Sequence, residues 1–155
     1  MHDMKIEIVR LEPMLVASTY GYGASPEDEA WKKMAAWTGP LGFFENLKVN
    51  PLYGYNNPPP LDGNKEYGYE LFIKVDKGTP PAEEVRIYFF YGGPFVVTRC
   101  DVRGGHFKDI PATWKRLERW CKHNGYTHAY RPGLERVVAG HDDHNELILD
   151  LYFPI

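Results

Sequence analysis

The chain has 155 residues, of which 43% are hydrophobic and 15% aromatic, and its formal net charge is −3. This length and apolar content suffice for one domain with its own core. Acidic side chains outnumber basic ones by 21 to 18, so we expect no basic surface and no direct binding of nucleic acid. No apolar run approaches the roughly 18 residues of a membrane span, and residues 1–10 lack the pattern of a signal peptide. The sequence therefore predicts a cytoplasmic protein without a membrane partner.

Cysteine and histidine placement predicts neither a metal site nor a cofactor. The two cysteines, Cys100 and Cys121, are expected on a strand and a helix as reduced, packed thiols. The tract from His141 to His144 encloses two aspartates but has the turn residues of a solvated hairpin, which we prefer to a metal site. The sequence has no phosphate loop, nucleophile elbow, zinc spacing or dinucleotide fingerprint, which disfavours the enzyme classes that depend on them.

The first predicted elements form a β-α-β-β series. The N-terminal segment alternates apolar and polar residues and bends at Pro13 into a second apolar run. A serine cap, a first-turn proline and three acidic residues predict a helix over 26–38, which Gly39 and the next proline end. Two further strands are predicted within 51–64 and at 67–75, separated by a proline-rich loop.

The same series repeats in the remainder of the chain. A polar stretch rich in proline and glycine separates the two series. Asp109 is the expected cap of the second helix. The predicted elements are a bent strand, a helix and two closing strands, at 84–102, 110–123, 128–140 and 146–155.

The two series align element for element, which predicts a duplicated α+β domain. We place one domain over 1–155, with pseudo-repeats 1–77 and 78–155. In each repeat one helix covers a sheet face only partly, so two antiparallel sheets gain by joining and sharing a core. A ligand groove is expected at the pseudo-twofold seam between the repeats.

The alignment also pairs individual side chains. Glu70 and Asp150 fall at the same position of the closing strands, so each repeat carries one carboxylate there. Each helix has a tryptophan on its apolar stripe. We expect Trp31 in the first helix, and Trp114 or Trp120 in the second, to face the sheet.

Aromatic residues are concentrated in short tracts. Tyrosines two residues apart lie on one face of a strand, where their rings can stack on a planar ligand while their hydroxyls find partners. Ordinary core packing is the alternative for any single ring. The aromatic residues that we expect to line a binding site are Tyr20, Tyr53, Tyr55, Tyr67, Trp114 and Tyr152.

Glu70 is the charged candidate for that site. Its neighbours are aromatic and aliphatic, which is typical of a central strand with apolar surroundings. A buried carboxylate is costly unless it meets a cation or hydroxyl donors such as tyrosines. The alternative is a structural hydrogen bond or an acid that faces a sheet edge.

Four tracts occur in a characteristic order: YGYNNPPP at 53–60, YGYELFIKV at 67–75, ATWKRLERWCKHNGY at 112–126 and LDLYFPI at 149–155. Together they resemble the GyrI-like effector-binding family over essentially the whole chain. Members of that family are drug- and dye-binding domains of multidrug-responsive transcription activators, stand-alone ligand binders, a gyrase inhibitor, and hydrolases of cyclopropane-bearing DNA-alkylating compounds. The resemblance implies the duplicated fold and carries the pocket glutamate of the family over onto Glu70. Asp150 stands where many relatives have a glutamate, which puts a role for its shorter side chain in doubt.

Three functions follow from the residues and the resemblance. The first is a stand-alone protein that binds a planar aromatic, often cationic, compound through ring stacking and the charge of Glu70. The second is a hydrolase in which Glu70 acts with Tyr69, or with Tyr67, to position or activate water that opens a strained ring. The third is a protein inhibitor of a DNA-handling enzyme, which the modest charge supports little. Because the repeats use all 155 residues, we expect no helix-turn-helix, so a transcription regulator would be a separate partner.

Overall fold

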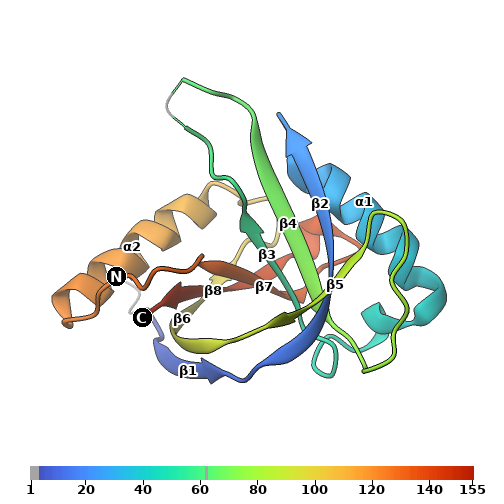
Figure 1. The fold of residues 1–155 in the computed structure, drawn as a ribbon. Coiled ribbons are helices and arrows are strands. Elements are labelled where there is room, and N and C mark those ends of the chain that lie inside the picture. The colour runs from blue at the N-terminus through green and yellow to red at the C-terminus, as the bar shows by residue number, and fades with distance from the viewer. Residues whose placement is uncertain (1–3, 62) are drawn as a thin grey trace. The chain divides into compact units, whose positions relative to one another are not determined.

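The computed structural model describes residues 4–61 and 63–155 and has an α+β fold (Figure 1). The chain forms two compact units. The first, which we call the continuous unit, is Pro13–Tyr91. The second, the split unit, joins the residues up to Glu12 to Gly92–Ile155. Within the described residues, no helix has the length and apolar character needed to cross a membrane.

The continuous unit combines one long helix with an antiparallel sheet. Its elements are β2 (Met14–Gly23), α1 (Pro26–Thr38), two short 3-10 turns (Gly39–Leu41 and Phe43–Glu45), β3 (Leu52–Asn56), β4 (Tyr67–Lys74) and β5 (Arg86–Phe90). The strands pair in the order β5-β2-β4-β3. Strand β4 therefore has a hydrogen-bonded neighbour on both sides, which makes it a central strand as its apolar sequence predicts.

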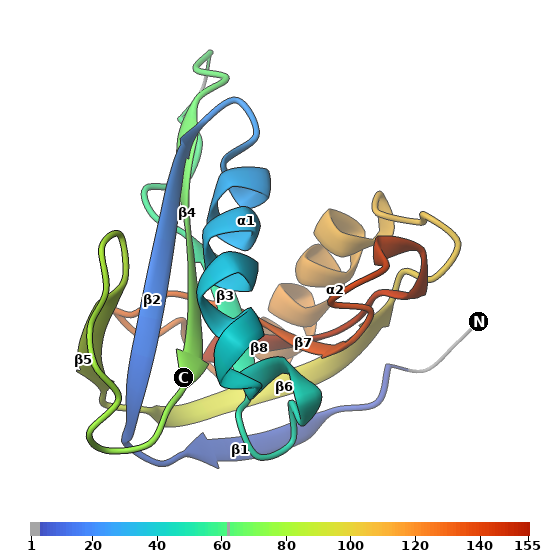
Figure 2. The same cartoon turned by 90° about the vertical axis from the view of Figure 1, so that its right-hand side faces the viewer.

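Helix α1 packs along one face of this sheet, beside β2 and β4 (Figure 2). Its buried side chains include Ala30, Met34 and Thr38, which recur every fourth residue and form one stripe. The backbone of the helix comes close to β2 because Gly21 has no side chain, and a Cβ there would lie 3.1 Å from the Ala30 nitrogen. The Thr19 hydroxyl donates to the Ala30 carbonyl at 2.8 Å, so this contact is also satisfied by a hydrogen bond.

The split unit repeats this arrangement. Its elements are β1 (Glu7–Leu11), β6 (Gly93–Asp101), α2 (Asp109–His123), β7 (Leu134–Ala139), a 3-10 turn (His144–Glu146) and β8 (Ile148–Pro154). The strands pair antiparallel in the order β1-β6-β8-β7, and α2 contacts β6 and β8. The sheet orders of the two units correspond strand for strand, which confirms the prediction of an α+β chain with two β-α-β-β series.

The edge strands are exchanged between the sequence repeats. Strand β1 precedes β2 in the chain but pairs with β6, and β5 precedes β6 but pairs with β2. Each bent strand that the sequence predicts is therefore two strands, divided at Pro13 in one repeat and at Gly92 in the other. Gly92 has φ 75°, a conformation that glycine adopts without strain. Each compact unit thus takes its edge strand from the other of the predicted repeats 1–77 and 78–155.

The helices differ from the prediction in two details. Trp31, Trp114 and Trp120 are half-buried, whereas the fully buried positions of α2 are Leu117 and Cys121. The tryptophans are thus less buried than expected, although the ring of Trp114 does face the sheet of its unit, since its ring nitrogen donates to Glu135 of β7. The predicted cap, Asp109, is instead the first residue of α2, and Lys108 precedes it at the cap position.

The buried stripe of α1 gives a test of the fold. We expect Met34→Ala to lower the free energy of unfolding by about 2–5 kcal/mol, because a fully buried side chain leaves a cavity. Lys32→Ala, at an exposed position of the same helix, is the matched control and should change stability by less than about 0.5 kcal/mol. Urea unfolding followed by circular dichroism measures both, and equal stability of the two variants would contradict the packing of α1.

Candidate functional site

The sheet of the continuous unit has two chemically different faces. Alternate residues of a strand point to opposite faces, and directly paired residues point to the same face. Thr19 of β2 contacts α1, so Tyr20 points away from the helix. Glu70 of β4 pairs with Tyr20 on one side and with Tyr55 of β3 on the other. We call the face that carries these three side chains the carboxylate face, and the opposite one the helix face.

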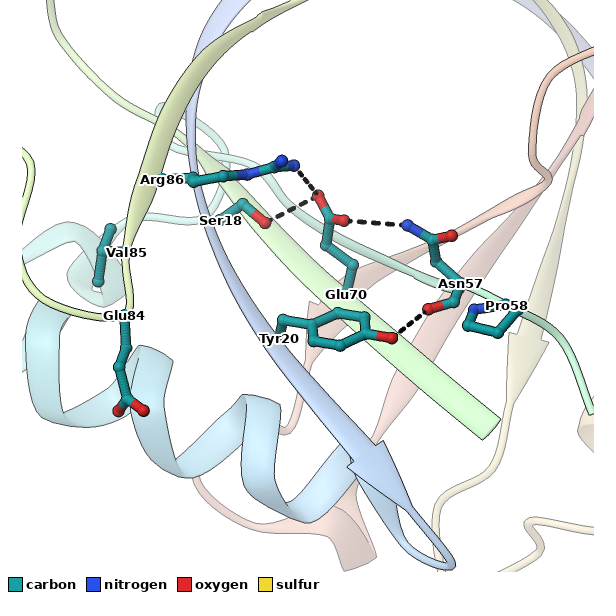
Figure 3. Close-up of a pocket in the computed structure, with 8 residues that line it drawn as sticks. All are labelled: Ser18, Tyr20, Asn57, Pro58, Glu70, Glu84, Val85 and Arg86. Carbon is teal, nitrogen blue, oxygen red and sulfur yellow. Dashed lines mark hydrogen bonds and ion pairs between the residues drawn. The ribbon is translucent and has the colours of Figure 1, made fainter. Parts of the chain in front are cut away.

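Both oxygens of the Glu70 carboxylate accept hydrogen bonds (Figure 3). Oε2 accepts from the Ser18 hydroxyl at 2.8 Å and from the Tyr88 hydroxyl at 2.5 Å. Oε1 accepts from the Asn57 side-chain amide at 3.3 Å. Glu70 is only 3% exposed, and these donors compensate for the water that its carboxylate has lost. The donors come from β2, β5 and the loop after β3, so the pairing of the sheet assembles them around Glu70.

Two tyrosine hydroxyls are held in their protonated form beside this carboxylate. Burial, and then the negative charge of Glu70 and a hydrogen bond to it, raise the pKa of Tyr55. Burial, and then the hydrogen bond to Glu70, raise the pKa of Tyr88. Deprotonation of either tyrosine would place a second negative charge next to Glu70, and both the burial of the phenol and the charge of Glu70 oppose this. Near neutral pH both phenols therefore act as donors to the carboxylate.

One cationic side chain, that of Arg86, approaches the Glu70 carboxylate. Nη2 of Arg86 lies 3.8 Å from Oε2 of Glu70, beyond hydrogen-bond distance but within range of an ion pair. The Arg86 side chain is 75% exposed, and its guanidinium lies over the ring of Tyr88, 5.0 Å from the ring centroid. The ion pair thus joins a buried carboxylate to a solvated cation.

Glu70 and Arg86 line a cavity of about 500 Å³. The residues around it are Ser18, Tyr20, Asn57, Pro58, Glu70, Glu84, Val85 and Arg86, all of which belong to the continuous unit (Figure 3). The Tyr20 hydroxyl donates to the Asn57 carbonyl at 2.7 Å, which fixes the ring as one wall. A Cβ at Gly68 would collide with that hydroxyl and that carbonyl, so the wall requires glycine at this position. The cavity is of the size that small-molecule sites usually have.

Aromatic rings extend the carboxylate face beyond Glu70. Phe72, two residues along β4, stacks on Tyr53 with ring centroids 5.3 Å apart. It also meets Tyr55 edge-on at 6.1 Å and Phe90 at 4.9 Å. Tyr53 and Phe72 are almost fully buried, so this cluster is a rigid apolar support next to the charged group.

The predicted site residues divide into three groups. Tyr20 and Glu70 line the cavity, and Tyr55 lies next to Glu70 in the sheet, whereas Tyr53 is buried in the aromatic cluster. Trp114 and Tyr152 belong to the split unit and are not among the lining residues. In that unit the Trp114 ring nitrogen donates to Glu135 at 3.5 Å, and Tyr152 is buried.

Tyr67 and Tyr69 lie on the helix face, on the other side of β4 from the Glu70 side chain. The Tyr67 hydroxyl donates to the carboxylate of Glu27 in α1. The Tyr69 ring covers Gly54 of β3, where a Cβ would collide with it. The structure therefore does not bring Tyr69 to Glu70, because adjacent residues of a strand point in opposite directions. The hydroxyl of Tyr88 in β5 does donate to the carboxylate.

Sequence reasoning missed four partners of Glu70: Ser18, Asn57, Arg86 and Tyr88. They are 52, 13, 16 and 18 positions away from it along the chain, so only the pairing of strands brings them close. A usable signal for Tyr88 was present, since the notable aromatic run 88–91 lies within a predicted strand. Placing Tyr88 beside Glu70 also requires knowing that β5 pairs with β2, and the sequence does not show this exchange of edge strands.

The corresponding position of the split unit has different chemistry. Asp150 of β8 pairs with Arg99 of β6 and with Arg136 of β7, where Glu70 has two tyrosines. Nε of Arg99 donates to Oδ1 of Asp150 at 2.9 Å. The carboxylate of this unit is thus matched by arginine through a direct charged hydrogen bond.

The described part of the chain holds neither a cluster of metal ligands nor an exposed cysteine. Residues 4–61 and 63–155 contain no group of three His, Cys, Asp or Glu side chains that could hold a metal ion. Both cysteines are buried and free. Burial raises the pKa of Cys100, and it raises the pKa of Cys121 to about 11, so both remain thiols at neutral pH.

Solved structures of the same fold are known. The C-terminal domain of EcmrR is 12% identical, with a TM-score of 0.70 and coverage of 97% of this chain and 96% of that chain. A hydrolase encoded by lin2189 from Listeria innocua is 13% identical, with a TM-score of 0.68 and coverage of 97% and 91%. SAV2435 bound to tetraphenylphosphonium is 13% identical, with a TM-score of 0.56 and coverage of 97% and 93%. At these identities the likeness is one of fold.

A longer EcmrR chain is known in a complex with DNA, and this chain spans 57% of the length of that one. No curated protein matches the chain. The family model of the GyrI-like small molecule binding domain matches residues 4–155, nearly the whole chain. A match of this extent, together with a cavity built around a buried glutamate, shows that the chain belongs to the GyrI-like small molecule binding domain family.

Proposed function

We propose that the chain binds aromatic cations in the cavity around Glu70. The observation that carries this proposal is a buried carboxylate whose hydrogen-bond partners Ser18, Asn57 and Tyr88 are all neutral. Neutral donors satisfy lone pairs but leave the negative charge in place. The nearest cation, Arg86, is largely solvated and lies 3.8 Å away, so the site can gain further from a cation brought by a ligand.

The surrounding rings support an aromatic ligand. Tyr20 lines the cavity and is 39% exposed, so part of its surface is open to contact. Rings of this kind attract a cation over their faces and tolerate many planar partners. SAV2435, which has the same fold, is bound to tetraphenylphosphonium, a cation with four phenyl groups, and this agrees with the proposal. A link to transcription regulation belongs to the same proposal, since in EcmrR a domain of this fold is part of a longer chain that forms a complex with DNA.

Glu70→Gln tests the role of charge. This change keeps the shape of the side chain and removes its charge, so tetraphenylphosphonium should bind about 10- to 100-fold more weakly, because the attraction between its charge and the carboxylate is lost. Neutral triphenylphosphine oxide should bind the variant and the unchanged protein alike. Isothermal titration calorimetry measures both affinities.

Asp150→Asn is the matched control for this experiment. It removes one carboxylate at the corresponding sheet position of the split unit, outside the residues that line the cavity. We expect it to leave the affinity for tetraphenylphosphonium unchanged, with folding verified by circular dichroism. If Glu70→Gln and Asp150→Asn had the same effect, or if both compounds lost affinity equally, Glu70 would be a structural residue and the cation proposal would fail.

A hydrolase is the second candidate, and one contact favours it. The Tyr88 hydroxyl and the Glu70 carboxylate are 2.5 Å apart at the edge of a cavity, where such a pair can position water and take up its proton. The Listeria innocua structure of the same fold is described as a hydrolase. In this candidate Glu70 accepts a proton from water while the water oxygen bonds to a carbon of the strained cyclopropane ring. The ring C–C bond at that carbon breaks, and its electron pair passes to a carbonyl group conjugated to the ring, which then takes a proton from solvent. Tyr88 takes the role that the sequence had suggested for Tyr69.

Turnover separates the two candidates. With excess protein and a cyclopropane-bearing alkylating compound, a hydrolase forms the ring-opened product, which mass spectrometry detects. Glu70→Gln should then lower the rate of this step by about 100-fold or more, the usual contribution of a general base, and by a larger factor than it lowers affinity. Tyr69→Phe should leave the rate unchanged, because that ring lies on the helix face. Binding of the compound without product would exclude the hydrolase.

A further inference from the structure

Arg86 occupies the part of the cavity where a cationic ligand would meet both of its recognition elements. Its guanidinium lies 3.8 Å from the Glu70 carboxylate and 5.0 Å from the centroid of the Tyr88 ring. A carboxylate and an aromatic face are the two groups that attract an aromatic cation. Figure 3 shows the side chain reaching from β5 toward Glu70. Arg86 therefore makes, within the chain, the contacts that the ligand would make.

The remaining charges of the cavity leave this role to Arg86. Among the eight lining residues it is the only cation. Glu84, the other acid, is 62% exposed, points away from Glu70, and forms an ion pair with Lys33 of α1 at 3.5 Å. The charge that a ligand would meet beside Glu70 is therefore that of Arg86.

Arg86 can leave this position at little cost. Its side chain is 75% exposed, and its contact with Glu70 is longer than a hydrogen bond. Ion pairs with a solvated partner contribute little to stability. Strand β5 pairs with β2 and is the outermost strand of the unit, so the arginine side chain has solvent to swing into. Glu70 keeps its neutral donors when Arg86 departs.

We propose that Arg86 is an internal counter-ion that aromatic cations displace from Glu70, and that it thereby sets the specificity of the pocket. This inference rests on the proposed function. A ligand with both charge and rings recovers the carboxylate contact and adds stacking on the tyrosines. A small cation such as ammonium recovers only the charge contact, so it gains nothing by exchange. A neutral aromatic leaves the Arg86–Glu70 pair in place.

The experiment compares Arg86→Met with the unchanged protein. Methionine resembles the apolar stem of arginine, is shorter, and removes the competing charge. Tetraphenylphosphonium should bind Arg86→Met about three- to tenfold more tightly, in keeping with the modest strength of an ion pair to a solvated arginine, and the neutral oxide controls for the space that the shorter side chain opens. Triphenylphosphine oxide should bind both proteins equally. Arg86→Lys keeps the charge and should retain the affinity of the unchanged protein for the phosphonium.

Two further variants isolate the pair. Arg99→Gln removes the same charge from the split unit, where Arg99 pairs with Asp150, and should leave the affinity unchanged. In a Glu70→Gln background, Arg86→Met should produce no gain, because the counter-ion then has no partner. Urea unfolding of Arg86→Met should match that of the unchanged protein, since the side chain is mostly solvated.

The outcomes distinguish this inference from the proposed function. If Glu70→Gln weakens phosphonium binding but Arg86→Met leaves it equal or weaker, Arg86 is not a competitor and only the counter-ion inference fails. An equal gain for phosphonium and phosphine oxide would show steric blocking, which also overturns it. If Glu70→Gln leaves phosphonium binding unchanged, or if neither the unchanged protein nor Arg86→Met binds it, the cation site itself is wrong and both proposals fail.

Discussion

The burial of one carboxylate in the middle of a β-sheet constrains the whole continuous unit. Glu70 lies on a strand with neighbours on both sides and is only 3% exposed, so the surrounding chain supplies hydrogen-bond donors to its carboxylate. Every donor depends on register. A slip of β4 by one residue would turn Glu70 toward α1 and bring Tyr69 to the carboxylate face. Only the observed register of β4 places Gly68 beneath the Tyr20 hydroxyl and brings Glu70 to Tyr88 of the exchanged edge strand.

The sequence predicted the parts of the fold that depend on local patterns. The helix over 26–38 was found in full, and the second helix differs from its prediction by one residue at its start, because proline, acidic and glycine residues mark their ends. The local sequence also identified Glu70 as a candidate site residue, since a charged residue within an apolar strand is unusual. Its partners could not be predicted in this way, because they come from other strands. The prediction that paired Tyr69 with Glu70 did not use the alternation along a strand, which places adjacent side chains on opposite faces of the sheet.

The two units place different electrostatics on one scaffold. At corresponding positions of their closing strands, Glu70 is flanked by tyrosines and Asp150 by arginines. Asp150 is matched by a direct bond from Arg99 at 2.9 Å, whereas Arg86 approaches Glu70 only to 3.8 Å, from the third strand. A shared backbone therefore permits either a closed ion pair or a pocket, and the side chains on the flanking strands decide between them.

The exchange of edge strands has a consequence for how such a pocket could arise. Glu70, Ser18 and Asn57 lie before the boundary between the sequence repeats, whereas Tyr88 and Arg86 lie after it. Two fragments cut at that boundary would each lack part of the cavity, and one would hold a carboxylate with neither its phenol nor its guanidinium. A chain with the first repeat alone could complete this cavity only by taking an edge strand from another copy. In the split unit the counterpart of β5 is β1, which has Glu7 and Val9 where β5 has Arg86 and Tyr88.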